Sequence, residues 1–199
     1  MINYIDNILF LIALILSISV FTYNFKRILY NISLGRDENR RDKPRLRLKN
    51  MIRVAFGQGK MIHRPIAGIL HLIVYVGFII INIELLEILI DGVFGSHRIF
   101  SSYFPKIYNI LIGSFEILAF LVLISVIIFL IRRNILKVKR FLKEEMKGWP
   151  KLDADLILYF EIVLMALFLT MNGADYTIQL NYPQNEVYVR AGSYPISQF

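Results

Sequence analysis

The chain has 199 residues, 56% of them hydrophobic, and a mean hydropathy of +0.55. This balance excludes an ordinary soluble domain and predicts an integral membrane protein. The absence of cysteine excludes disulfide bonds, thiolate metal sites and an iron–sulfur cluster held by the chain itself. The net charge of +8 comes mainly from cations between the apolar segments, which argues against a nucleic-acid-binding protein.

Four apolar segments divide the chain. Each can cross a bilayer as a helix, the first together with its flanks and the fourth, a short run over Leu156–Met171, by extending towards Leu180. The first has no basic start and no small-residue cleavage site, which indicates a retained helix and not a signal peptide. Pro65 suits the first turn of the second helix, where its missing amide hydrogen is not needed. We predict an all-α polytopic transmembrane bundle of four spans, forming a single domain over residues 1–199. The expected spans are about residues 5–25, 65–90, 107–131 and 155–175.

The cations are concentrated in two connections. Twenty of the 23 lysines and arginines lie in residues 26–64 and 132–153. In a chain of four spans these connections share one side, which the positive-inside rule makes cytoplasmic. Both termini then face outward. We therefore expect a multi-pass protein of the inner (cytoplasmic) membrane, with the lipid bilayer and not nucleic acid as the partner of these cations.

His71 is the histidine inside the second span. It follows Pro65 by six residues, which places it about 9 Å into the bilayer from the cytoplasmic end. Tyr75 and Phe78 share its helix face, and Gly68 lies one turn before it. An imidazole between aromatic rings and a small residue suits the edge of a haem, because histidine is an axial ligand of haem iron. The alternative is a histidine hydrogen-bonded to a neighbouring helix.

The other two histidines lie at the ends of this segment. His63 precedes His71 by eight residues, about 12 Å along one helix, so a single iron cannot take both. It is either an interfacial residue or a ligand of a second centre. His97 and Arg98 belong to the outer surface, as a solvated loop or as a site for a quinone carbonyl or a haem propionate. No two histidines of the chain make an axial pair.

Two cations flank the inner end of the second span. Lys60 closes the sequence GQGK, which lacks the spacing of a phosphate-binding loop. Lys60 and Arg64 are placed to bind haem propionates at the inner interface, with lipid head groups as the alternative.

The acidic residues form a second set. Glu84, Glu87 and Asp91 fall on one stripe of the second span, roughly opposite His71, and Glu116 lies at a similar level in the third. Carboxylates in a membrane usually mark proton routes or hydrogen-bonded pairs. Both interpretations of Glu84, Glu87 and Glu116 stay open: a proton path, or structural pairs near the interface.

Several short motifs together resemble one family over about residues 50–199. They are FGQGKM, Pro65-x-x-Gly68-x-x-His71, Gly77–Phe78, the DGVFGSHR of Asp91–Arg98, NGAD from Asn172, and the final GSYPISQF. As a set they resemble the membrane portion of heterodisulfide-reductase-like (Fe–S)-binding oxidoreductases. Those proteins in turn resemble the nitrate reductase gamma subunit, a b-type cytochrome.

The resemblance implies electron transfer between the quinone pool and an iron–sulfur or flavoprotein partner on the cytoplasmic side. Haem b would be the cofactor, with His71 at the position of a metal ligand, and quinone the substrate. No residue is assigned a catalytic role, and the chain would be one part of a quinone-linked oxidoreductase. In such proteins a fifth span with further histidines and a cysteine-rich iron–sulfur domain follow. This sequence stops at Phe199 before either, so we expect the second axial ligand and the cluster to lie on a partner or on a longer form.

Two other classes of function stay open. The first is a redox-silent membrane subunit that anchors or scaffolds a larger complex, favoured by the lack of a histidine pair and of cysteine. The second is a proton-coupled transporter built on the acidic residues. Against the transporter, the chain has no internal repeat and no pair of helices broken by glycine or proline.

Overall fold

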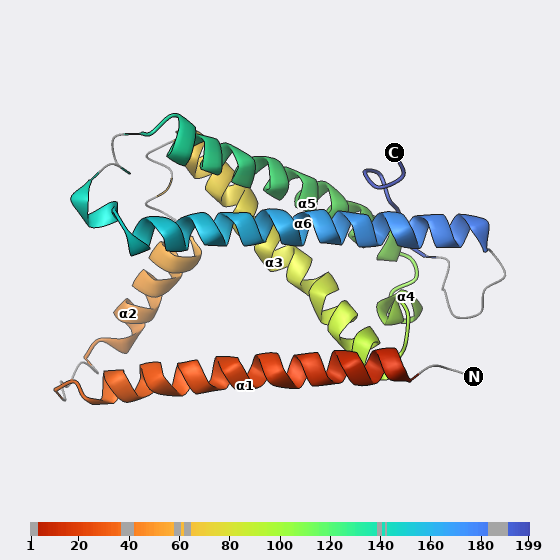
Figure 1. Cartoon of the computed structure of the whole chain (residues 1–199), viewed down its shortest axis with the longest axis horizontal. Helices are drawn as coiled ribbons and strands as arrows, with labels where there is room; N and C mark the ends of the chain where they lie inside the picture. The colour runs from red at the N-terminus through yellow and green to blue at the C-terminus, as the bar shows by residue number, and fades with distance from the viewer. Residues whose placement is uncertain are drawn as a thin grey trace. The chain divides into compact units, whose positions relative to one another are not determined.

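The computed structural model describes residues 4–36, 42–57, 61, 65–138, 141, 143–182 and 191–199. Every regular element in those ranges is helical (Figure 1), which confirms the all-α prediction. The long helices are α1 (Ile5–Ser33), α3 (Pro65–Phe94), α5 (Tyr108–Leu130) and α6 (Trp149–Asn181). The short ones are α2 (Pro44–Met51), α4 (Ile99–Tyr103), the π-helical turns η1 (Ile52–Phe56) and η2 (Ile131–Ile135), and the 3-10 turn η4 (Glu144–Met146).

Four helices are long and apolar enough to cross a membrane: Ile5–Ser33, Pro65–Phe94, Tyr108–Ile135 and Trp149–Asn181. The predicted number and order of spans are therefore confirmed, and by length and composition the chain is a multi-pass membrane protein. Three of the helices run well beyond the predicted ends, and α6 has 33 residues. A helix of that length measures about 50 Å against a hydrocarbon core of about 30 Å, so its polar ends extend into the head-group layers or the helix tilts.

The chain divides into two compact units, one of residues 1–60 and 89–96, the other of residues 61–88 and 97–199. In the first unit, Asn7 Nδ2 donates a hydrogen bond to the carbonyl of Gly92 at 2.9 Å. The ring of Phe10 lies against the same glycine, where an added Cβ would come within 2.6 Å of it. No residue of α1 is buried, so this helix presents apolar side chains on all sides, as a lipid-facing helix does.

The second unit has its core between α5 and α6, which lie side by side (Figure 1). The buried residues of α5 recur at alternating steps of three and four, the spacing of a helix seam that packs against a neighbour. These are Ile112, Phe115, Ala119, Val122 and Val126, and they meet Met165 and Phe168 of α6. On α3, a Cβ added at Gly77 would lie 2.4 Å from Val122 Cγ2. The glycine therefore lets α3 approach α5 closely.

Candidate functional site

His71 lies on α3 in the second unit and is partly buried. Within the described ranges its imidazole has no hydrogen-bond or ion-pair partner, and no group of three or more potential metal ligands occurs there. Both interpretations of His71, a haem ligand or a histidine hydrogen-bonded to a neighbouring helix, stay predictions. An imidazole inside a membrane span is costly without a polar partner.

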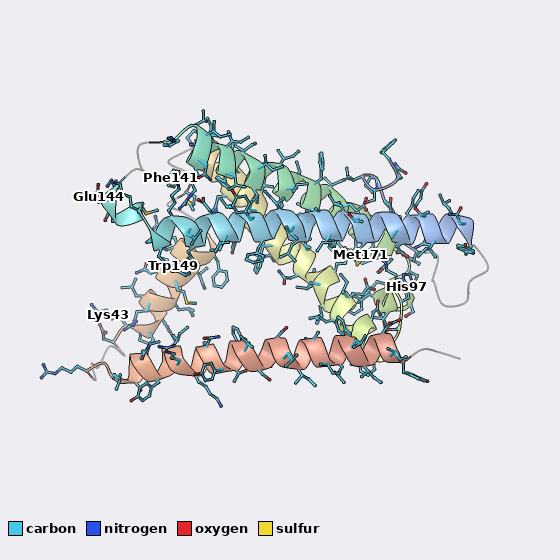
Figure 2. The ribbon with its side chains drawn as sticks, in the orientation of Figure 1. Lys43, His97, Phe141, Glu144, Trp149 and Met171 are labelled. Atoms are coloured by element: carbon cyan, nitrogen blue, oxygen red, sulfur yellow. The ribbon has the colours of Figure 1, made fainter. Side chains whose placement is uncertain are left out.

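The other predicted ligands do not join His71. His63, Lys60 and Arg64 lie outside the described residues. Arg98 is bonded to Glu84, which follows His71 on α3 by 13 residues, about 20 Å of helix. Figure 2 marks His97 and Trp149 towards opposite ends of α6. The structure therefore puts His71 and the His97–Arg98 pair in separate places.

Arg98 is the centre of a buried polar network, here called the Arg98 network. Its residue is 6% exposed. Nη1 donates to Glu84 Oε1 at 2.8 Å, Nε to Asp175 Oδ2 at 3.0 Å and Nη2 to Asn172 Oδ1 at 2.8 Å. Glu84 belongs to α3, whereas Asn172 and Asp175 belong to α6. One guanidinium thereby ties two spanning helices together near the end opposite the basic connections.

Asp175 receives further donors in the same network. The Nε2 of His97 lies 2.9 Å from its Oδ1, and the hydroxyl of Tyr194 donates to its Oδ2 at 2.7 Å. Burial raises the pKa of the Tyr194 phenol, which keeps it protonated as a donor. Burial alone would lower the pKa of Arg98, but the surrounding anionic groups raise it above its usual range. Arg98 therefore stays protonated across the physiological pH range, as the donor at the centre of the network.

Glu87 joins three helices near the same end. Its Oε1 accepts the backbone amide of Phe100 at 2.8 Å, and its Oε2 accepts the hydroxyl of Tyr108 at 2.7 Å. Phe100 is in the first turn of α4 and Tyr108 starts α5. A carboxylate at a helix start satisfies an amide that has no partner within the helix.

Glu116 binds the C-terminal segment, residues 191–199, to α5. Its Oε2 accepts the amides of Ile196 at 3.0 Å and Ser197 at 3.3 Å, and the Ser197 hydroxyl lies 2.5 Å from Oε1. Glu84, Glu87 and Glu116 are 0%, 2% and 0% exposed. In the described part of the chain they have separate partners, and no hydrogen bond joins one of these carboxylates to another. Each of the three glutamates connects its own helix to another segment of the second unit.

Sequence reasoning singled out Glu84 and Arg98 but missed their α6 partners. A signal for those partners exists. Asn172, Asp175 and Gln179 are spaced three and four residues apart, so they form a polar stripe on one face of α6. All three are buried. A polar stripe near the end of one span predicts a complementary stripe on its neighbour.

The basic end of the second unit has its own ion pair. Arg133 of η2 is buried, and its Nε lies 2.7 Å from Asp155 Oδ1 of α6. Its Nη2 donates to the carbonyl of Lys151 at 3.0 Å, and its guanidinium lies 5.4 Å from the centre of the Phe141 ring. This pair fixes the end of α5 against the start of α6.

Two mainly apolar cavities accompany these sites. One of about 620 Å³ opens beside Arg132 and Arg133. The other, of about 460 Å³, lies among α3, α5 and α6 and includes Asn82 and Glu161 in its lining. His71 lines neither cavity.

No protein-family model, curated protein sequence or solved structure matches the chain.

Proposed function

We propose that the chain is the membrane domain of a quinone-linked electron-transfer system and that His71 is an axial ligand of a b-type haem. The observation that supports this proposal is the position of His71 on a membrane-spanning helix without a polar partner among the described residues. A membrane-embedded imidazole is costly unless it has a partner, and histidine is an axial ligand of haem iron.

The arrangement of three residues on one face of α3 supports a haem on that side of the helix. His71 offers its imidazole, and the aromatic rings of Tyr75 and Phe78 follow on the same helix face. The chain's other described histidine, His97, is bound to Asp175 at the far end. We therefore expect the second axial ligand to come from a further helix, on a partner chain or in a longer form of this protein. When bound, the haem would supply the one-electron chemistry, and the protein its ligation and electrostatics.

The remaining residues take separate roles in this proposal. Lys60 and Arg64 stay candidates for the haem propionates, and His63 for a second centre. Arg98 already donates to three buried side chains, so we assign it to joining α3 and α6.

The proposed orientation follows from the charges. The positive-inside rule puts both basic connections on the cytoplasmic side of the inner membrane and both termini outside. An iron–sulfur or flavoprotein partner would dock on the cytoplasmic side and exchange electrons with the quinone pool through the haem.

The experiment is a reduced-minus-oxidised spectrum of the protein purified with its native neighbours, recorded with quinol as the reductant. We expect a b-type absorbance that is lost in His71→Ala and kept in His97→Gln, the matched control at the other described histidine. Absence of b-type absorbance from the native protein, or its survival in His71→Ala, would refute the proposal.

A second candidate is a redox-silent membrane anchor of a larger complex. The observation that favours it is that the polar side chains at the outer end, Arg98 and the three glutamates, are all engaged in joints between helices. The anchor predicts that the native complex keeps its full activity in His71→Ala and loses its membrane attachment when this chain is deleted.

A further inference from the structure

The cavity of about 620 Å³ lies where α3 begins, α5 and η2 end, and α6 begins. Eleven of the described residues line it, and all of these except Arg132 and Arg133 are apolar or proline. Ile66 and Ala67 come from α3, Phe129 from α5, and Ile157 and Leu158 from α6. Its volume is within the range of natural ligand sites, about 300–1,000 Å³. Among the residues that the structure describes, this end of the unit thus offers an apolar cavity whose charged lining residues are Arg132 and Arg133.

The two arginines of the cavity differ in their bonding. Arg133 is neutralised by Asp155, at 2.7 Å. It also donates to the carbonyl of Lys151 and lies over the Phe141 ring. Arg132 is partly buried, and its side chain has no acidic or hydrogen-bonding partner in the ranges that the structure covers. Because the Arg133–Asp155 pair cancels, the excess positive charge among the described lining residues comes from Arg132. A guanidinium in this state favours an anionic ligand, and phosphate matches its geometry with two parallel hydrogen bonds.

The position of the cavity identifies the source of the anion. It lies at the ends of three helices that can span a membrane, and the basic connection 132–153 starts at Arg132. The apolar walls then face acyl chains, while Arg132 lies near the head-group layer. Basic pockets between membrane helices bind anionic lipid head groups.

We propose that this cavity is a binding site for one anionic phospholipid. Arg132 binds the phosphate, the apolar walls hold the acyl chains, and Arg133 is a positioning residue that fixes the floor of the site through Asp155. The site is independent of haem binding at His71, which lines no part of it.

The test is native mass spectrometry of the full chain in detergent with added phosphatidylglycerol or phosphatidylcholine. Two variants change the site: Arg132→Gln removes the charge, and Ala67→Trp fills the cavity while leaving Arg132 in place. Arg45→Gln, on α2 and outside the lining, removes the same charge elsewhere. A helix-content measurement confirms that each variant is folded.

We expect one phosphatidylglycerol per chain to be retained by the unchanged protein and by Arg45→Gln. Arg132→Gln should weaken its binding by about tenfold or more, the loss expected for one charge-assisted hydrogen bond, and Ala67→Trp should weaken it similarly. Phosphatidylcholine should bind at least tenfold more weakly. Equal retention by Arg132→Gln, an equal loss in Arg45→Gln, or equal binding of both lipids would overturn the proposal. So would displacement of the lipid by soluble glycerol phosphate, because the site would then recognise phosphate alone.

Discussion

Replacing Arg98 by glutamine tests the physical basis of the fold most sharply. The change removes three hydrogen bonds of 2.8–3.0 Å, to Glu84, Asn172 and Asp175. It also leaves two buried carboxylates without their cation. Removing one partner of a buried ion pair costs about 3–5 kcal/mol, because the remaining charge stays buried and uncompensated. We therefore expect Arg98→Gln to lower the free energy of unfolding by at least about 3 kcal/mol.

In Arg98→Gln, Asp175 and Glu84 would keep different numbers of hydrogen-bond partners. Asp175 keeps the Tyr194 hydroxyl at 2.7 Å, the His97 ring at 2.9 Å and Gln179 at 3.3 Å. Glu84 has Arg98 as its hydrogen-bond partner, and its Oε2 has none among the described residues. Most of the stability lost in Arg98→Gln should therefore come from the burial of Glu84 without a cation. Neutralising Glu84 in the same chain, as Arg98→Gln with Glu84→Gln, should recover more stability than adding Asp175→Asn.

The assay is reversible unfolding of the unchanged chain, Arg98→Gln, its two double variants and one control, in mixed micelles of increasing denaturing detergent. Unfolding is followed by far-UV circular dichroism. Arg45→Gln on the exposed face of α2 is the matched control and should stay within about 0.5 kcal/mol of the unchanged chain. A loss below about 1 kcal/mol in Arg98→Gln would contradict the reasoning. A larger recovery from Asp175→Asn than from Glu84→Gln would contradict it as well.

Two further predictions concern packing and pH. Gly77→Leu should destabilise the second unit by about 1–3 kcal/mol, because even a Cβ at this position would lie 2.4 Å from Val122 Cγ2. In the same unfolding assay, adding Val122→Ala should recover part of the lost stability. Because burial raises the pKa of Tyr194 above its unfolded value of about 10, its contribution is complete below that pH and is lost as pH rises further. An alkaline titration of stability should fall more steeply for the unchanged chain than for Tyr194→Phe, and parallel curves would contradict the assigned role.

Hydropathy is enough to predict the four spans, because crossing a bilayer requires long apolar helices. It predicts helix ends poorly. The final turns of α6 contain Asn172, Asp175 and Gln179, which lower local hydropathy, yet the helix continues to Asn181. Asn172 Oδ1 accepts a hydrogen bond from Arg98, and Gln179 donates to Asp175. The sequence shows Glu84, Glu87 and Asp91 as an acidic stripe that could form pairs. It does not show which residues are their partners.

Those partners depend on backbone geometry that residue patterns do not specify. Arg98 reaches Glu84 because the chain reverses after Gly95, whose φ is +69°, and Arg98 itself adopts a left-handed conformation with a φ of 55°. Glu116 meets Ser197, 81 residues later in the chain, through the fold-back of the C-terminal segment. Pairings over such separations arise only when the helices have assembled, so a local pattern cannot predict them.

The central proposal is that His71 binds haem, and haem content per chain tests it most directly. The measurement is pyridine haemochromogen absorbance relative to protein concentration, for the native complex and for His71→Gln purified in the same way. We predict that His71→Gln loses at least one haem per chain, while His97→Gln keeps the native ratio. An unchanged ratio in His71→Gln would contradict the assignment and leave this chain as a membrane bundle without a haem ligand at that position.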